Sequence, residues 1–209
     1  MKLIAFDMDG TLIRNTDSVA FLCRLCGVDP GALAEINSRE SSGAISWIEA
    51  DYARVRLIRG LPLGMIREAF DTHIQLISGL GAVMDHLRKK NYRAMLVTAG
   101  PRQVADILSE RYRFDDCFGS DYEVIDGRFT GRIRSHMGSL GKAKCLQRIC
   151  LREGIHSEDC VAVGDSASDI GLFQSAGRSI AINFSPELKP YATHAIRTND
   201  LPDILPLLD

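Results

Sequence analysis

Short apolar runs alternate with segments of helical periodicity along most of the chain. Residues 2–6 form an apolar run that ends in an acidic cluster, which is the pattern of a buried strand. Further strands are predicted over residues 92–97, 160–163, 179–182 and 195–196. Helices are predicted over residues 82–90, 101–111, 140–152, 168–175 and 201–208. This alternation predicts an α/β fold with a doubly wound, Rossmann-like parallel sheet and helices on both faces.

Two segments depart from this rhythm. Between the first two strands the pattern is helical throughout, with helices predicted over residues 17–26, 32–38, 45–58 and 63–72. We therefore expect residues 14–79 to form a helical cap inserted after the first strand. Residues 1–13 and 80–209 would form the core domain. The second departure is a hairpin over residues 121–133 that turns at Asp126-Gly127, because this dipeptide favours a tight turn.

Composition and charge exclude several classes of protein. A chain of 209 residues fits one domain with an insertion. The net charge of −2 gives no electrostatic footprint for nucleic acid or an anionic membrane, and we interpret Arg54, Arg56 and Arg59 as a solvated helix face. The longest uncharged stretch, residues 74–84, is too short to cross a bilayer, and the first residues do not read as a signal peptide. We expect a cytoplasmic protein, and the sequence makes no prediction about its oligomeric state.

The cysteines and histidines indicate no metal centre. Cys23 and Cys26 have C-x-x-C spacing, which suits a redox or zinc site but also two residues that pack on one helix face. Packing is favoured because there is no second such pair and no matching pair of histidines. The six cysteines are expected to be reduced, and the five histidines show no zinc-ligand spacing.

Chemically suggestive residues follow the predicted strands. Asp7 and Asp9 come directly after the first strand, and two carboxylates this close can divide the work of attack and proton transfer. Thr98, Ala99 and Gly100 follow the second strand, where a hydroxyl and backbone N–H groups at a helix start can hold a phosphate oxygen.

Two further motifs have ordinary alternatives. Lys142 opens a helix and could neutralise a phosphate, although a surface lysine is the ordinary interpretation. Asp165 and Asp169 follow another apolar strand and offer the oxygen ligands that Mg²⁺ prefers. Alone, they could equally be a turn residue and a residue that stabilises a helix N-terminus. The recurrence of such motifs in one chain favours a functional site.

Taken together, these motifs resemble those of the haloacid dehalogenase superfamily of aspartate-nucleophile phosphatases. Over the whole chain the resemblance extends to the phosphoserine phosphatase branch. The segments that carry the resemblance to this branch are residues 126–131, 141–144 and 159–165, together with the helical insertion.

The resemblance implies a reaction. Asp7 would attack phosphorus and form a phosphoaspartyl intermediate, and Asp9 would protonate the leaving alkoxide and then activate water. Mg²⁺ would be held by the Asp7 carboxylate, the Asp9 backbone carbonyl and Asp165, with Asp169 supporting the metal site. The implied reaction is hydrolysis of a small phosphorylated metabolite, O-phosphoserine in this branch, and a role in serine biosynthesis follows only with that substrate.

The resemblance also implies binding residues. Thr98, the Ala99 N–H and Lys142 would grip the phosphoryl oxygens, which agrees with the need of phosphoryl transfer for positioning and charge neutralisation. Arg54 falls where this branch places an arginine that reaches the substrate carboxylate, and Trp47 falls at the position of a lid aromatic. The alternatives for these two are a surface arginine and a core tryptophan.

The chain departs from the branch at three places. Thr16, with Asp17 next to it, stands where the branch has a glutamate that pairs with the substrate ammonium. Thr98-Ala99-Gly100 stands in place of the usual Ser-Gly-Gly motif, and Ser168 replaces an asparagine. Another small phosphomonoester is therefore an alternative substrate.

Other activities stay open. A phosphotransferase would pass the phosphoryl group to an alcohol instead of water. A dehalogenase needs no acid for an alkoxide, so Asp9 argues against it. A non-catalytic phospho-ligand-binding protein is disfavoured because the catalytic carboxylates and Lys142 are all present.

Overall fold

A computed structural model describes residues 1–208, without the side chains at positions 139 and 140. Among these residues seven strands form one sheet with the order β4-β3-β2-β1-β5-β6-β7. The strands are β1 Lys2–Phe6, β2 Tyr92–Pro101, β3 Asp116–Ile125, β4 Arg128–Ser135, β5 Cys160–Gly164, β6 Arg178–Ile182 and β7 His194–Ile196. Only β3 and β4 pair antiparallel in the described part of the chain, so the predicted parallel sheet is confirmed.

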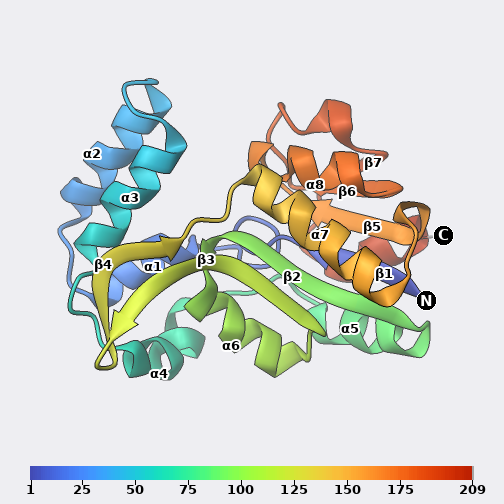
Figure 1. Ribbon diagram of the computed structural model, residues 1–209, viewed down its shortest axis with the longest axis horizontal. Helices are drawn as coiled ribbons and strands as arrows, with labels where there is room; N and C mark the ends of the chain where they lie inside the picture. The colour runs from blue at the N-terminus through green and yellow to red at the C-terminus, as the bar shows by residue number, and fades with distance from the viewer. Residues whose placement is uncertain (209) are drawn as a thin grey trace.

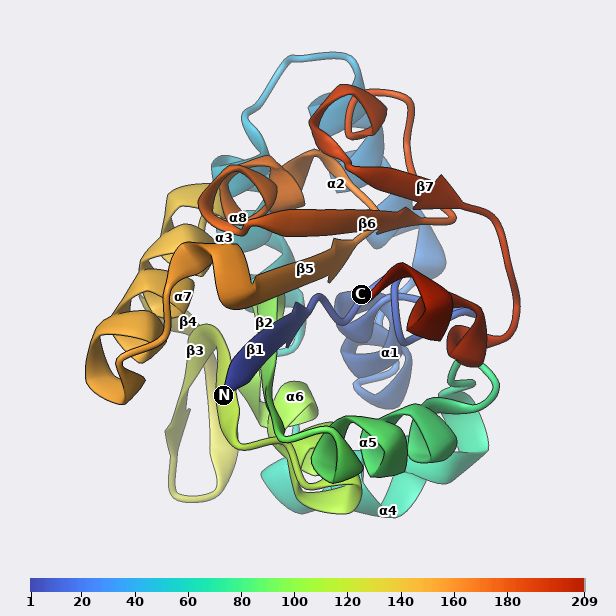
Figure 2. The same cartoon turned by 90° about the vertical axis from the view of Figure 1, so that its right-hand side faces the viewer.

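The order of the strands reverses at β1. From β1 the chain moves outward through β2 and β3 and then returns to β5 on the other side. In open α/β sheets this reversal leaves a crevice at the carboxyl ends of the strands, where ligands bind. Figure 1 shows these ends facing the helices drawn in blue and cyan, and Figure 2 shows the two chain termini at the opposite end of the sheet.

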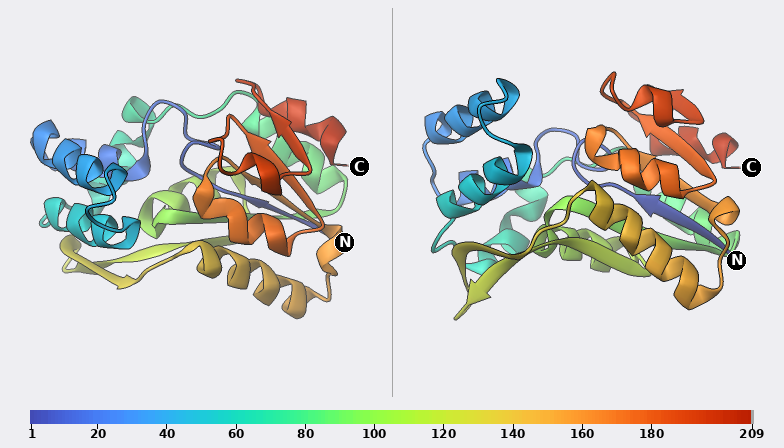
Figure 3. Two further views of the ribbon diagram at one scale, coloured as in Figure 1. Left: turned by 90° about the horizontal axis from the view of Figure 1, so that it is seen from above. Right: turned by 45° about the horizontal axis from the view of Figure 1, so that its top comes forward.

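Helices cover both faces of the sheet, as predicted. The helices are α1 Ser18–Leu25, α2 Pro30–Ser41, α3 Trp47–Leu57, α4 Leu63–His73, α5 Leu80–Lys89, α6 Arg102–Tyr112, α7 Ser139–Glu153 and α8 Ile170–Ser175. Side chains of β1 alternate between two buried clusters. Ile4 and Phe6 pack with residues of α1, α4, α5 and α6, whereas Leu3 and Ala5 pack with residues of α7 and α8. Figure 3 shows α7 and α8 together on one side of the sheet.

The predicted helical run after the first strand is present as α1 to α4. The Asp17 side chain caps α1 by accepting a hydrogen bond from the Ala20 N–H at 2.7 Å. A capping box of Ser46 and Glu49 starts α3. α2 and α3 stand as a pair beside the carboxyl ends of the strands (Figure 3). The division of the chain at residues 14–79 stays a prediction.

Several predicted boundaries were wrong. β2 continues past residue 97 to Pro101, because an irregular pairing with β3 carries the strand onward. The antiparallel pairing of the hairpin begins at Asp121 as predicted, but it ends at Ser135 instead of residue 133, and β3 itself starts earlier, at Asp116, where it pairs in parallel with β2. The last predicted helix is a 3₁₀ helix, Leu201–Leu207, in which Pro206 lacks the N–H that an α-helix would need. The helix predicted over residues 168–175 is a 3₁₀ turn, Ala167–Asp169, followed by α8.

The described chain also bears on the membrane and cysteine predictions. Within residues 1–208, every helix is too short or too polar to span a bilayer. The six cysteines carry free thiols. Cys23 is buried in the core and Cys26 packs against it, which matches the expected packing role of this pair.

Candidate active site

Asp7 lies directly after β1 and is almost fully buried, with 3% of its surface exposed. Its backbone N–H donates to the Val163 carbonyl at 2.9 Å, which holds it against β5. The Lys142 ammonium donates to its Oδ1 at 2.7 Å. A carboxylate in this position would be expensive to bury without such a cation.

Lys142 has no exposed surface and comes from the first turn of α7. Its Nζ donates to Asp7 at 2.7 Å, to Ser168 at 3.0 Å and to Asp169 at 2.7 Å, so all three ammonium protons are used. Burial opposes its charge, but Asp169 and Asp7 outweigh this and raise the pKa of Lys142 above its usual value. Lys142 therefore stays charged and is not the surface lysine of the ordinary interpretation.

Three carboxylates meet at this point of the sheet. Asp7, Asp165 and Asp169 each offer an oxygen within 4.8 Å of the others. Burial, together with the charges of neighbouring carboxylates, raises the pKa of Asp7 to about 6 and that of Asp165 to about 8. Asp165 Oδ1 is buried and has no hydrogen-bond partner among the described residues. An unsatisfied carboxylate oxygen beside two further carboxylates fits a hard divalent cation, so these residues can hold a metal ion.

Asp9 has separate partners, although it lies only two residues beyond Asp7. Its Oδ1 accepts from the Ser18 N–H at 2.8 Å and its Oδ2 from the Ser18 hydroxyl at 2.5 Å. Burial raises the pKa of Asp9 to about 7, against the opposing hydrogen bond from Ser18. A carboxyl with this pKa can both donate and accept a proton near neutral pH. Sequence reasoning missed the contact with Ser18.

Glycines allow these carboxylates to approach the loops. Gly10 has φ +79°, and a Cβ there would lie 2.2 Å from Asp165 Oδ2. A Cβ at Gly100 would lie 2.7 Å from Asp9 Oδ2. Larger residues at either position would push the acidic groups apart.

Thr98 and Ala99 lie on the last residues of β2, where the pairing with β3 is irregular. The Thr98 side chain is buried, and its Oγ1 accepts from the Gly100 N–H at 2.9 Å. The Ala99 carbonyl accepts a 2.7 Å hydrogen bond from the Ser120 hydroxyl of β3. β2 thus carries this segment to the same strand ends as Asp7 and Asp9.

A cavity of about 270 Å³ opens beside Asp9. One wall comes from α1 to α3 and the segment before α1, and the other from the ends of β1 and β2 and from Ser168. The lining residues are Asp9, Asp17, Val19, Leu33, Asn37, Trp47, Asp51, Arg54, Ala99, Gly100 and Ser168.

The predicted cap residues differ in their relation to this cavity. Trp47 lines it and is half-buried, so it is not a core tryptophan. Arg54 lines it too, but as a fixed group and not part of a solvated face, since it pairs with Asp51 at 3.1 Å and with Glu40. Thr16 is not among the described residues that line the cavity, and its hydroxyl donates to the Asp17 carbonyl at 3.3 Å. Asp17 does line it.

The sheet and this acidic site define an α/β protein that binds its ligand at the carboxyl ends of its strands. The family model for haloacid dehalogenase-like hydrolase matches residues 4–174. The chain belongs to this family.

Several proteins similar to this chain are phosphoserine phosphatases. The chain is 33% identical over 201 residues to the phosphoserine phosphatase of Archaeoglobus fulgidus, covering 96% of this chain and 58% of that protein. It is 31% identical to that of Methanocaldococcus jannaschii, covering 98% and 96%. It spans only 50% of the relative from Streptomyces coelicolor.

Solved structures agree in fold with this chain. A phospho-aspartyl intermediate analogue of phosphoserine phosphatase matches with a TM-score of 0.87 and 30% identity, covering 100% of this chain and 99% of that one. A substrate-bound phosphoserine phosphatase complex matches with the same TM-score and identity, covering 100% and 98%.

Proposed function

We propose that this chain hydrolyses a small phosphomonoester through a phosphoaspartyl intermediate, with O-phospho-L-serine as substrate. The observation that carries the proposal is that the two aspartates, Asp7 and Asp9, bind different groups. Asp7 accepts a hydrogen bond from Lys142 and lies beside Asp165 and Asp169, whereas Asp9 binds Ser18 and lines the cavity. The names of the relatives at about a third identity support the same reaction and substrate.

In the first half-reaction, an Asp7 oxygen attacks phosphorus and the bond from phosphorus to the serine oxygen breaks. Asp9 gives its proton to that oxygen. In the second half-reaction, Asp9 takes a proton from a water whose oxygen attacks phosphorus, and the Asp7 carboxylate and inorganic phosphate are released. The pKa of Asp9, about 7, suits both directions of proton transfer.

The phosphoryl group would be held by Thr98, the Ala99 N–H and Lys142. Lys142 provides a buried positive charge next to Asp7, which would stabilise the negative charge on the phosphoryl oxygens. Thr98 and Ala99 are brought to the same strand ends by β2. The bond from Lys142 to Asp7 and the position of Thr98 and Ala99 at the strand ends support these roles.

We propose Mg²⁺ as the metal. The Asp7 carboxylate, the Asp9 backbone carbonyl and Asp165 would hold it, and Asp169 would keep Lys142 and the loop in place through its bonds to Lys142 and to the Asp165 N–H. When bound, this ion would neutralise charge between nucleophile and phosphate. The unsatisfied Asp165 Oδ1 supports the assignment.

The serine moiety would lie in the cavity. Its carboxylate would face Arg54, and its ammonium would face Asp17 instead of the branch's glutamate, because Asp17 lines the cavity and Thr16 does not. Trp47 would cover the same space.

The test is phosphate release from O-phospho-L-serine in the presence of Mg²⁺, with an aryl phosphate alongside. We expect turnover of both, higher kcat/KM for phosphoserine, and loss of both in Asp7→Asn. Turnover of the aryl phosphate alone would keep the mechanism and reject the substrate. Activity that survives EDTA, or transfer of phosphate to added alcohols in preference to water, would reject the metal-dependent hydrolase.

A further inference from the structure

The half-buried Asp51 links Arg54 of the cavity wall to His136 behind it. One of its oxygens accepts from Arg54 at 3.1 Å, and the other lies 3.0 Å from His136 Nε2. The exposed fractions are low at 16% for Arg54, 15% for Asp51 and 11% for His136. Because a carboxylate oxygen accepts, His136 Nε2 carries the proton of this hydrogen bond.

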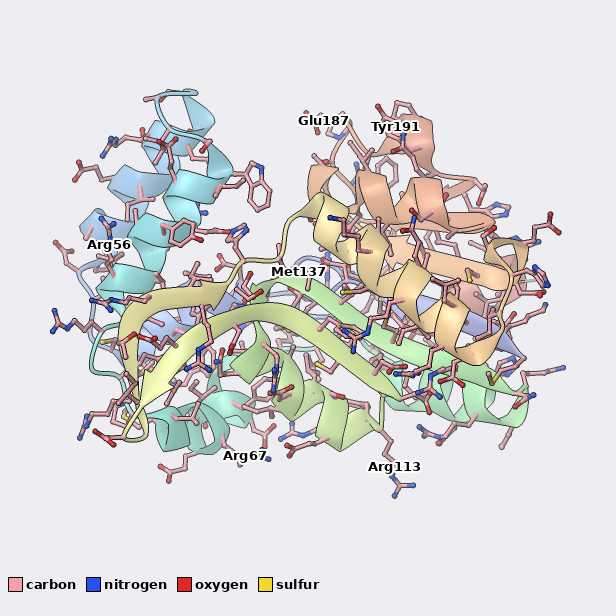
Figure 4. All side chains as sticks on the ribbon, viewed as in Figure 1. Arg56, Arg67, Arg113, Met137, Glu187 and Tyr191 are labelled. Carbon is pink, nitrogen blue, oxygen red and sulfur yellow. The ribbon has the colours of Figure 1, made fainter. Side chains whose placement is uncertain are left out.

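His136 comes from outside the helices that carry its partners. Asp51 and Arg54 belong to α3, and the other partners of Arg54, Asn37 and Glu40, belong to α2. His136 belongs to the linker between β4 and α7, in which Met137 follows it (Figure 4). Among the described residues it is thus the side chain that ties this charged cluster to the sheet.

The imidazole ring is fixed by packing. Its centroid lies 5.1 Å from that of Trp47 and 5.8 Å from that of Tyr52, with the Tyr52 ring stacked. Gly138, two residues further on, also lies against Trp47, since a Cβ there would be 3.6 Å from the indole. The packing therefore holds the His136 ring in the orientation that the hydrogen bond to Asp51 requires, and the ring has little freedom to turn.

The same linker is tied to the predicted phosphate end of the site. The Met137 N–H donates to the Ser120 hydroxyl at 2.9 Å, and that hydroxyl donates to the Ala99 carbonyl at 2.7 Å. Residues 136–138 thus connect the end of β2 with Asp51 and Trp47 of α3.

We propose that His136 is a positioning residue, which orients Arg54 through Asp51 and thereby sets recognition of the substrate carboxylate. The proposal rests on the proposed function, in which Arg54 faces that carboxylate. His136 itself lies behind the cavity wall and is not among the residues that line it in the described chain. Its effect is on binding of the leaving group, not on phosphoryl transfer.

The test compares substrates with and without a carboxylate. O-phospho-L-serine and O-phosphoethanolamine share the phosphate and the ammonium, and only the first has a carboxylate. In His136→Asn the amide cannot reach the position of Nε2. We expect KM for phosphoserine to rise about tenfold, the effect of one lost hydrogen bond to a charged group, with KM for phosphoethanolamine and kcat for an aryl phosphate unchanged.

His136→Gln is the matched rescue, because its amide nitrogen reaches the place of Nε2, and it should retain most of the preference for phosphoserine. His86→Asn on α5 is the control for loss of a half-buried histidine elsewhere. The positioning role alone would be overturned if His136→Asn reduced kcat/KM equally for all three substrates. It would also be overturned if His136→Asn kept the wild-type preference for phosphoserine over phosphoethanolamine. A wild-type protein that turns over the aryl phosphate without preferring phosphoserine to phosphoethanolamine would overturn both this role and the proposed substrate.

Discussion

Asp7 and Asp9 show how two identical side chains acquire different properties from their contacts. Asp7 is paired with a buried ammonium, and Asp9 receives only hydrogen bonds from Ser18. Opposite charge favours ionisation of Asp7 as a nucleophile, whereas burial without a cation favours the protonated form of Asp9 as an acid. The assignment of roles thus follows from environment and not from position in the motif.

Replacement of Ser18 tests this assignment. In Ser18→Ala the hydroxyl bond to Asp9 Oδ2 is lost, and the backbone bond to Oδ1 stays. We expect kcat to fall by roughly ten- to a hundredfold, because a bond to a charged group that aims the catalytic carboxyl is removed. The pKa of Asp9 should rise further, since the Ser18 bond lowers it. Steady-state kinetics over a pH series measure both.

Ser175→Ala is the control, because the Ser175 hydroxyl bonds only a carbonyl of its own helix in the described structure. It should leave kcat and the pH profile unchanged. A Ser18→Ala variant with wild-type kcat would show that Asp9 is positioned by other groups.

The acidic cluster predicts how the stability of the metal-free protein depends on pH. The pKa values of Asp7, Asp9 and Asp165 in the folded protein are about 6, 7 and 8, each above the ordinary value of 3.8. The folded state therefore binds more protons than the unfolded state, and stability falls as pH rises from about 4 to 8. We expect the Tm in EDTA to decrease across this range.

Added Mg²⁺ should raise the Tm most at the alkaline end, because it binds the ionised carboxylates of the folded state. Asp165→Asn removes one of the three groups and should flatten the pH dependence in EDTA. A Tm in EDTA that is constant or rises between pH 5 and 8 would contradict the raised pKa values of these buried acids.

At the scale of the element, the loop after β1 depends on a glycine for two separate reasons. Gly10 has a positive φ, and a Cβ there would meet Asp165, so Gly10→Ala brings both backbone strain and a clash with the carboxylate. Gly27 has φ +70°, and nothing lies within 4 Å of the place that a Cβ would take, so Gly27→Ala brings the strain alone. Strain of this kind costs about 1–2 kcal/mol.

We therefore expect Gly27→Ala to lower the free energy of unfolding by about that amount and to leave kcat/KM unchanged. Gly10→Ala should cost more stability and reduce kcat/KM by at least about a hundredfold, because Asp165 must move from the cluster. Urea unfolding and steady-state kinetics of the two variants separate the effect of backbone strain from that of the clash with Asp165. Equal effects of the two substitutions on activity would argue against close approach of the loop to Asp165.

Elements with strong patterns were the most predictable part of the molecule. The apolar run of β1 and the helical periodicity of α1 are local patterns, and both elements were predicted correctly. The length of β2 and the start of β3 depend on a pairing between distant residues, which local pattern does not contain. The contacts of Asp51 with His136 join residues 85 positions apart, and no spacing rule indicates them. The motifs of Asp7, Thr98 and Asp165 were found because each lies at the end of a parallel strand, and such strands bring their ends together, whereas Lys142 was found at the start of a helix.

For the whole molecule, α2 is a helix with little buried surface. None of its residues is fully buried; Leu33 packs against the core only partly buried, and Glu40 and Asn37 bind Arg54 of α3. α5, in contrast, buries Leu80, Val83, Met84 and Leu87. Segments with little buried apolar surface open more easily, so amide exchange should be faster in α2 than in α5.

A ligand that fills the cavity would join α2 and α3 to the sheet, since Leu33, Asn37, Trp47 and Arg54 line one wall and Ala99 the other. With Mg²⁺ and orthovanadate, which mimics the transferring phosphoryl group, together with serine, we expect amide exchange in α2 and α3 to slow by at least about tenfold. Exchange in α5 should not change. Exchange mass spectrometry on the full chain resolves the three helices. Uniform slowing of all helices would indicate general stabilisation, and unchanged exchange in α2 and α3 would show that these helices do not close over the ligand.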